Sequence, residues 1–216
     1  RSKDPSAIAQ VLDRVDQVSP GARAVVVVSP SFGDAGDWAG LLSGAAARGH
    51  AVDAGAKIDL RVDGIDPLAV SLEPLTAVAD YYVVVLGDTS ATSTAAAQLA
   101  RVVDKVRALR GGVPVVLVAH STAGLGAREL TASDPSKVRA LVTIATPFGG
   151  SPLLPLRDAE VADAQRRLAA FGAIGAAGGP LARALAGLTT ALDGFALDDP
   201  ALPPRPSGFP WADFAG

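Results

Sequence analysis

The chain has 216 residues, of which 49% are hydrophobic and 19% charged, and its net charge at pH 7 is −3. This length suits one domain with a single sizeable core, and the small negative charge without a lysine or arginine cluster argues against nucleic-acid binding. Cysteine is absent, which excludes disulfides, thiolate nucleophiles and cysteine-bound metals. The absence of cysteine does not indicate a cellular compartment, because a disulfide-free domain of this size folds inside or outside the cell.

Helix and strand patterns alternate along the first 150 residues. An amphipathic helix is expected at 6–18, followed by a buried strand at 24–28 and a helix at 37–48, with Asp37 as its cap and Gly49 as its stop. The remaining elements, in chain order, are a half-exposed strand at 57–63, a buried strand at 81–86, a helix at 95–109, a buried strand at 114–119, a helix ending near 132 and a strand at 138–145. Strands alternating with helices predict an α/β domain on a parallel sheet.

A serine lies at the junction of the strand at 114–119 and the helix after it. The stretch reads "VVLVAHSTAGLGAREL", so Ser121 has small residues, Ala119 and Ala123, two positions away on either side. A sharp strand-to-helix turn needs such small residues because it leaves no room beside the central side chain. This is how a nucleophilic serine is presented, with the N–H of Thr122 at a helix N-terminus where it can donate to an oxyanion.

Three segments in this order resemble the α/β-hydrolase superfamily, especially its lipase-like and PGAP1-like esterase members. "AHSTAG" looks like the family's nucleophile turn, and "TIATPFGGSPL" resembles a strand end that often reads TPHxGS, here with Phe148 for the histidine. The segment "VVVVSPSFGDAGDWAGLLSGAAARGH" resembles the early strand, oxyanion loop and first helix. The resemblance covers about residues 23–153, and residues 52–80 look like an insertion.

The resemblance implies a serine hydrolase of the esterase or lipase type, without cofactor or metal. Ser121 is then the catalytic nucleophile, and the backbone N–H groups of Thr122 and Ser31 form the oxyanion hole. Phe32 and Phe148 are expected to contact a small hydrophobic or acyl ester substrate. Family members usually have His-Gly where this chain has Ser29-Pro30, but that change leaves an N–H at Ser31.

Three regions are expected along the chain. Residues 1–153 form the hydrolase core with its insertion at 52–80, residues 154–197 form an apolar helical cap or lid, and residues 198–216 form a proline-rich tail without a strand. The longest uncharged part of the cap is shorter than a bilayer span needs, so no transmembrane segment is expected.

The histidine of a catalytic triad is missing from its expected place. The family order is serine, acid, histidine, and neither His50 nor His120 follows Ser121. His120 is the turn residue itself, and its side chain should diverge from the serine hydroxyl. His50 follows a helix of about twelve residues that descends roughly 18 Å from the active-site edge of the sheet, which is too far for a general base.

The sequence therefore predicts a chain that lacks the last strands of the fold, together with the triad acid and histidine. Residue 1 is arginine and no methionine occurs, which suggests a processed or trimmed piece of a longer protein. A partner chain or missing segment is expected to pair with the open sheet edge. The alternative is an inactive pseudo-hydrolase that serves as a binding or interaction module.

Other polar residues have simpler explanations. Asp88 follows a strand on the same sheet edge as Ser121, but capping of the next helix is favoured over a role as the acid. The glycines after Phe32 do not form a G-x-G-x-x-G or Walker loop. With no cysteine and no clustered histidine, no metal site is expected.

Overall fold

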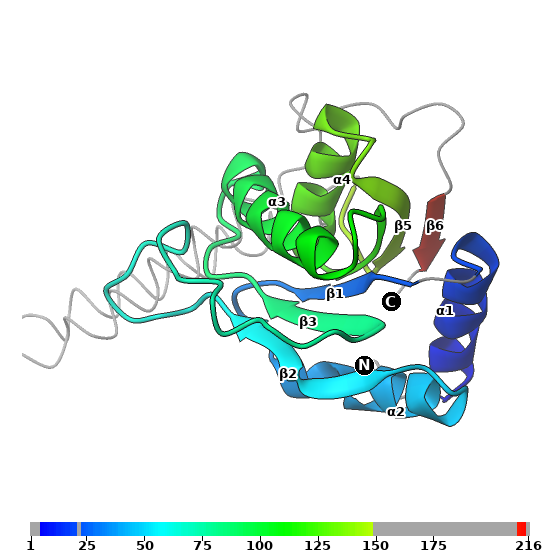
Figure 1. Cartoon of the computed structure of the whole chain (residues 1–216). Coiled ribbons are helices and arrows are strands. Elements are labelled where there is room, and N and C mark those ends of the chain that lie inside the picture. The colour runs from blue at the N-terminus through cyan, green and yellow to red at the C-terminus, as the bar shows by residue number, and fades with distance from the viewer. Residues whose placement is uncertain (1–4, 21–22, 149–210, 215–216) are drawn as a thin grey trace, which may run out of the picture. The chain divides into compact units, whose positions relative to one another are not determined.

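The structure is a computed structural model that describes residues 5–20, 23–148 and 211–214 (Figure 1). The chain divides into two compact units, one made of Arg1–Thr146 and Leu202–Gly216 and the other of Pro147–Ala201. The cap expected at 154–197 lies outside the described residues, and the elements below belong to the first unit.

The described elements alternate as the sequence predicts. In chain order they are α1 (Pro5–Val18), β1 (Val25–Ser29), the 3₁₀ helix η1 (Ala35–Trp38), α2 (Ala39–Ala47), β2 (Val52–Asp59), β3 (Tyr81–Val85), α3 (Thr92–Leu109), β4 (Val115–His120), α4 (Ala123–Ser133), β5 (Val138–Ile144) and β6 (Trp211–Phe214).

The strands form one parallel sheet with the order β2-β3-β1-β4-β5-β6. β1 lies between β3 and β4, with Val28 beside Val84 on one side and Ala119 on the other. After β1 the chain leads to β2 at one end of the sheet, whereas after β4 it leads to β5 on the opposite side. The strand order therefore reverses between β1 and β4, which is where open parallel sheets form a crevice beyond their carboxyl ends.

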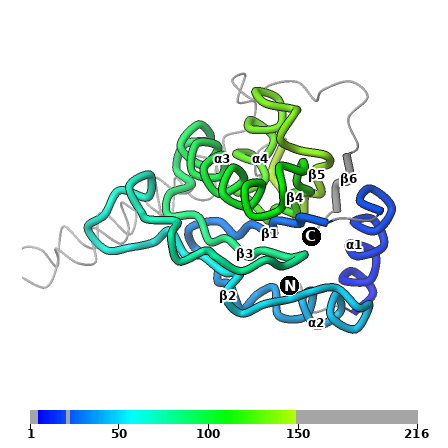
Figure 2. Tube along the Cα trace, in the orientation of Figure 1, coloured from blue at the N-terminus to red at the C-terminus, as the bar shows by residue number. Residues whose placement is uncertain are grey.

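Helices cover both faces of the sheet. α3 and α4 lie on one face, and α1 and α2 lie on the other (Figures 1 and 2). This layering requires strands that are apolar on both faces, and β1 and β3 are buried along their whole length. The fold class predicted from the sequence, an α/β-hydrolase-like parallel sheet flanked by helices, is confirmed.

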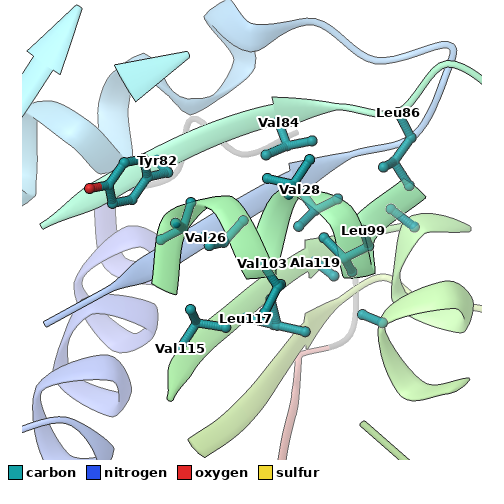
Figure 3. Packing of buried hydrophobic residues seen from close by; sticks show 14 of the residues in the cluster. Val26, Val28, Tyr82, Val84, Leu86, Leu99, Val103, Val115, Leu117 and Ala119 are labelled. Carbon is teal, nitrogen blue, oxygen red and sulfur yellow. The ribbon is translucent and has the colours of Figure 1, made fainter. Parts of the chain in front are cut away.

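Alternate residues of the central strands supply two separate cores. Val26, Val28, Leu117 and Ala119 pack with Leu99 and its neighbours under α3 and α4 (Figure 3). The intervening strand residues face α1 and α2, where the second core contains Val25, Val27, Val116, Val118, Val11, Leu12, Val15, Trp38, Leu41 and Leu42. Each fully buried valine or leucine stabilises the fold by about 1.5–3 kcal/mol relative to an exposed one.

Two strands differ from the sequence-based expectation. β2 occupies Val52–Asp59 rather than 57–63, and Val62 is 41% exposed although it continues the apolar alternation. The expectation that no strand follows 138–145 is wrong, because β6 pairs in parallel with β5 from Leu141 to Ile144. In both cases hydrogen bonds from a neighbouring strand define the element, and a local apolar pattern does not report them.

The start of the second helical region also differs. Asp37 does not cap α2, whose N-cap is Trp38 without a side-chain bond. The N-cap of η1 is Asp34, which accepts the Gly36 N–H, and the Asp37 carboxylate accepts the Asp34 N–H at 2.9 Å. The two aspartates form a reciprocal capping box. The predicted stop is confirmed, since Gly49 has a φ of 84°.

Candidate active site

Ser121 follows the last residue of β4 in a backbone conformation that serine seldom adopts. Its φ is 54°, in the left-handed region, which costs a non-glycine residue roughly 1–2 kcal/mol. Its N–H donates to the Ile144 carbonyl of β5 at 2.9 Å, and its carbonyl accepts the Gly124 N–H at 3.0 Å. The sheet on one side and the first turn of α4 on the other therefore hold the strained residue in place.

The helix after Ser121 packs closely against its surroundings. A Cβ on Gly124 would lie 2.0 Å from Thr146 Oγ1, and one on Gly126 would lie 2.6 Å from the Cβ of Ala95 in α3. Ala123 is fully buried. The small residues after the serine therefore allow α4 to approach both the end of β5 and α3.

Thr122 lies at the N-terminus of α4. It has helical angles, with φ −60° and ψ −24°, and makes no side-chain cap. The first bonds of this turn come from the N–H groups of Gly124 and Leu125, so the N–H of Thr122 precedes the helical ladder. Such an N–H, at the positive end of a helix dipole and next to Ser121, suits a developing negative charge.

Ser31 lies in a tight turn after β1. The Gly33 N–H donates to the Pro30 carbonyl at 2.9 Å, which closes the turn around Ser31 and Phe32. The Ser31 hydroxyl bonds to Thr89 Oγ1 at 2.9 Å. Because β1 and β4 are neighbours, this turn and the Ser121 turn occupy adjacent strand ends at the reversal of the sheet.

Of the two aromatic residues expected to contact substrate, Phe32 and Phe148, the structure describes the surroundings of the first only. Phe32 is 56% exposed, at the tip of the turn that contains Ser31. Phe148 belongs to the second unit, nearly all of which lies outside the described residues, so its role stays a prediction.

His50 lies at the amino-terminal edge of the sheet, as the sequence predicts. Its ring centroid is 5.8 Å from that of Tyr81, the first residue of β3. Its Nδ1 is 2.7 Å from Arg23 Nη1, and its Nε2 is 3.5 Å from an Asp16 carboxylate oxygen. Ser121 is at the carboxyl-terminal edge, so His50 is not placed to take its proton.

His120 is the last residue of β4. Strand side chains alternate, and Val116 and Val118 face the core under α1 and α2, so His120 belongs to that face. Burial lowers the pKa of its imidazole below the usual 6.5. It is therefore neutral at pH 7 and directed into the layer that carries η1.

This environment predicts a pH-dependent stability that depends on His120. Because its folded-state pKa is depressed, the unfolded chain binds more protons, and the free energy of unfolding falls as the pH drops below about 6.5. We expect the loss measured by urea unfolding between pH 7.5 and 5.5 to be smaller in His120→Gln. An equal loss in both proteins would show that His120 does not contribute, since other groups titrate alike in the two.

The structure corrects the role of Asp88. Its carboxylate accepts the Ser90 N–H at 2.8 Å, whereas the N-cap of α3 is Ala91, with no side-chain cap. Asp88 therefore shapes the loop after β3 and does not cap the helix. The buried amide of Gln98 holds the same loop, because its Oε1 accepts the Gly87 N–H at 2.7 Å and its Nε2 donates to the Asp88 carbonyl at 2.7 Å.

We also searched the part of the chain that the structure describes for metal sites, membrane spans and grooves. No three histidine or acidic side chains come together there as metal ligands. Within the same residues, no helix is both long and apolar enough to cross a membrane. A groove of about 580 Å³ runs between α1 and α2 and includes neither Ser121 nor Ser31.

Comparison with known families identifies this arrangement. Residues 81–190, just over half of the chain, match the family model described as the alpha/beta hydrolase fold. The chain belongs to the α/β-hydrolase family. The matched region of this α/β-hydrolase starts at the first residue of β3 and includes the whole Ser121 turn.

Family membership supports a hydrolase-like function. A comparison with curated proteins found no match, so the PGAP1-like esterase subtype stays a prediction.

Proposed function

We propose that this α/β-hydrolase is a serine esterase in which Ser121 is the nucleophile. The observation that carries the proposal is the left-handed φ of Ser121 in a strand-to-helix turn, at the point where the strand order of the sheet reverses. Strained backbone held by surrounding structure is concentrated at functional sites. A serine in this position has its hydroxyl above the carboxyl edge of the sheet.

The reaction is an acyl transfer in two steps. Ser121 Oγ attacks the ester carbonyl carbon and passes its proton to a base, while the N–H groups of Thr122 and Ser31 stabilise the oxyanion. Collapse of the intermediate breaks the bond to the alcohol, which takes the proton from the base. Water, activated by the same base, then releases the acid and restores the serine.

The base must be a group other than the two histidines of this chain. His50 is bound to Arg23 at the opposite edge of the sheet, and His120 belongs to the α1 and α2 face. Asp213 is the residue that fits the position of the triad acid in the chain order of the family. It lies in β6, the strand after β5, and its backbone lies beside that of Thr143. We propose that the histidine comes from residues outside this chain.

The turn beside the nucleophile supports the proposed substrate class. Phe32 is a large exposed side chain adjacent to Ser31, which supports a hydrophobic or acyl ester. Exposed aromatic surface near a site contributes binding when substrate covers it.

A second candidate function is a binding module without catalysis. The positions of the two histidines favour it, since a serine without a base is a weak nucleophile. In this case β2 or β6, which end the described sheet, would pair with a partner chain, as an open strand edge allows.

The two functions are separated by hydrolysis of p-nitrophenyl esters from acetate to decanoate, assayed with protein from its native source. The esterase proposal predicts turnover about 10³-fold or more above that of Ser121→Ala, with kcat/KM rising with acyl length. If the wild-type protein hydrolysed every ester no faster than Ser121→Ala, the esterase proposal would be wrong and the binding module would be favoured.

A further inference from the structure

An arginine from a distant segment holds the turn that contains Ser31. Arg61, two residues after β2, donates from Nη1 to the Gly33 carbonyl at 2.8 Å and to the Ser31 carbonyl at 3.2 Å. One guanidinium therefore bonds to two carbonyls of the same four-residue turn, from a position 28 residues further along the chain.

The guanidinium is itself held in place. Asp59 accepts Arg61 Nε at 2.9 Å and Nη2 at 2.6 Å, and also the Arg61 backbone N–H at 2.9 Å. The hydrogen bonds from Arg61 lower the pKa of the Asp59 carboxyl, so the pair stays charged at neutral pH. This two-bond geometry fixes the plane of the guanidinium and directs Nη1 at the turn.

The backbone beneath Arg61 is also fixed. Leu60 is fully buried, and its N–H donates to the Val85 carbonyl of β3 at 2.9 Å. Gly87 approaches so closely that a Cβ there would lie 2.5 Å from the Leu60 carbonyl oxygen. Arg61 therefore extends from a rigid point on the edge of the sheet.

Holding these carbonyls sets the direction of the Ser31 N–H. The Pro30 carbonyl accepts the Gly33 N–H, and across a trans peptide the N–H of Ser31 points away from that carbonyl. Rotation of this peptide would require Gly33 to move, and Gly33 is held through its own carbonyl by Arg61. A second anchor is the Ser31 hydroxyl bond to Thr89, in the loop organised by Gln98.

We propose that Arg61 is a positioning residue that preorganises the oxyanion hole by holding the Pro30–Gly33 turn, an inference that rests on the esterase function proposed above. Donors that are already directed at the developing charge need no reorganisation during the reaction. The edge strand β2, with the segment after it, thus contributes to the site through the bonds of Arg61 to the Pro30–Gly33 turn.

The test compares Arg61→Ala and Arg61→Lys with Arg101→Ala as a matched control. Arg101 also donates to two backbone carbonyls, those of Pro67 and Val70, but neither belongs to the turn. We expect Arg61→Ala to lower kcat for ester hydrolysis about 10- to 100-fold with little change in KM. Arg61→Lys should recover part of kcat, because lysine keeps the charge but lacks the planar fork, and Arg101→Ala should leave kcat unchanged.

Amide hydrogen exchange supplies a readout that does not depend on activity. In Arg61→Ala the Gly33 amide should exchange about tenfold faster than in the wild type, and in Arg101→Ala it should not. Unchanged kcat and exchange in Arg61→Ala, or equal effects of both substitutions, would overturn the proposal. If the wild type hydrolyses no ester, the esterase function fails, and the exchange rate alone decides whether Arg61 holds the turn.

Discussion

Gly124→Ala is expected to lower the free energy of unfolding by about 2–3 kcal/mol, through overpacking at the serine turn. The new Cβ would lie 2.0 Å from Thr146 Oγ1, 2.7 Å from its Cγ2 and 2.9 Å from its Cβ. Rotation of the threonine relieves only the first two contacts, so the backbone must shift. The gain of about 1 kcal/mol from placing alanine in a helix is too small to offset this cost. Urea unfolding measures the difference.

Two further variants identify the cause of this loss. Thr146→Ala removes the two nearest atoms, so Gly124→Ala should be less destabilising in that background, with a coupling energy of about 1 kcal/mol or more. Gly55→Ala is the matched control, because its Cβ would meet only an Asp53 carboxylate oxygen at 3.2 Å and the Ala77 Cβ at 3.6 Å. Equal stability losses in Gly124→Ala and Gly55→Ala would contradict the close approach.

Substitution of Ser121 should separate activity from stability. Ser121→Ala and Ser121→Gly both remove the nucleophile, so both should reduce ester turnover to the background rate. Ser121→Gly should nevertheless be about 1 kcal/mol more stable than Ser121→Ala, because glycine adopts a φ of 54° without steric cost. Ester assays and urea unfolding of the same preparations test both parts.

Ala145 provides an internal comparison for the strain. It has a φ of 51° and follows β5, whose last residue accepts the Ser121 N–H. Ala145→Gly should therefore raise stability by a similar amount while retaining Ser121 and its activity. A free energy of unfolding that neither glycine substitution raises would contradict backbone strain at Ser121 and Ala145.

The central strands could be predicted from the sequence almost to the residue. The runs at 24–28, 81–86, 114–119 and 138–145 coincide with β1, β3, β4 and β5 to within one residue at each end. These strands are buried on both faces, and burial on both faces requires a continuous run of β-branched and apolar residues. The Ser121 turn could be predicted for the same reason: the apolar run of β4 ends just before this serine, which has Ala119 and Ala123 two positions away on either side.

The edges of the sheet could not be predicted in this way. Val52–Gly55 is exposed, so its pairing with β3 has no apolar signature. β6 has only four residues and depends on β5 for its hydrogen bonds. Edge strands of this kind are defined by their neighbours more than by their own side chains.

Only the local part of the candidate site could be predicted from the sequence. Ser121, Thr122 and Ser31 follow from turns that short motifs describe. Arg61 could not be predicted, because it bonds to Ser31 and Gly33, which lie 30 and 28 positions before it in the chain. An exposed arginine after a strand has no local sequence pattern that indicates such distant partners.

The most direct test of the nucleophile is denaturing mass spectrometry of native-source protein after incubation with a fluorophosphonate probe. A single adduct is expected, mapped to Ser121 by peptide sequencing and absent from Ser121→Ala. No adduct, or an adduct on another residue with Ser121 unmodified, would contradict the assignment of Ser121 as the nucleophile.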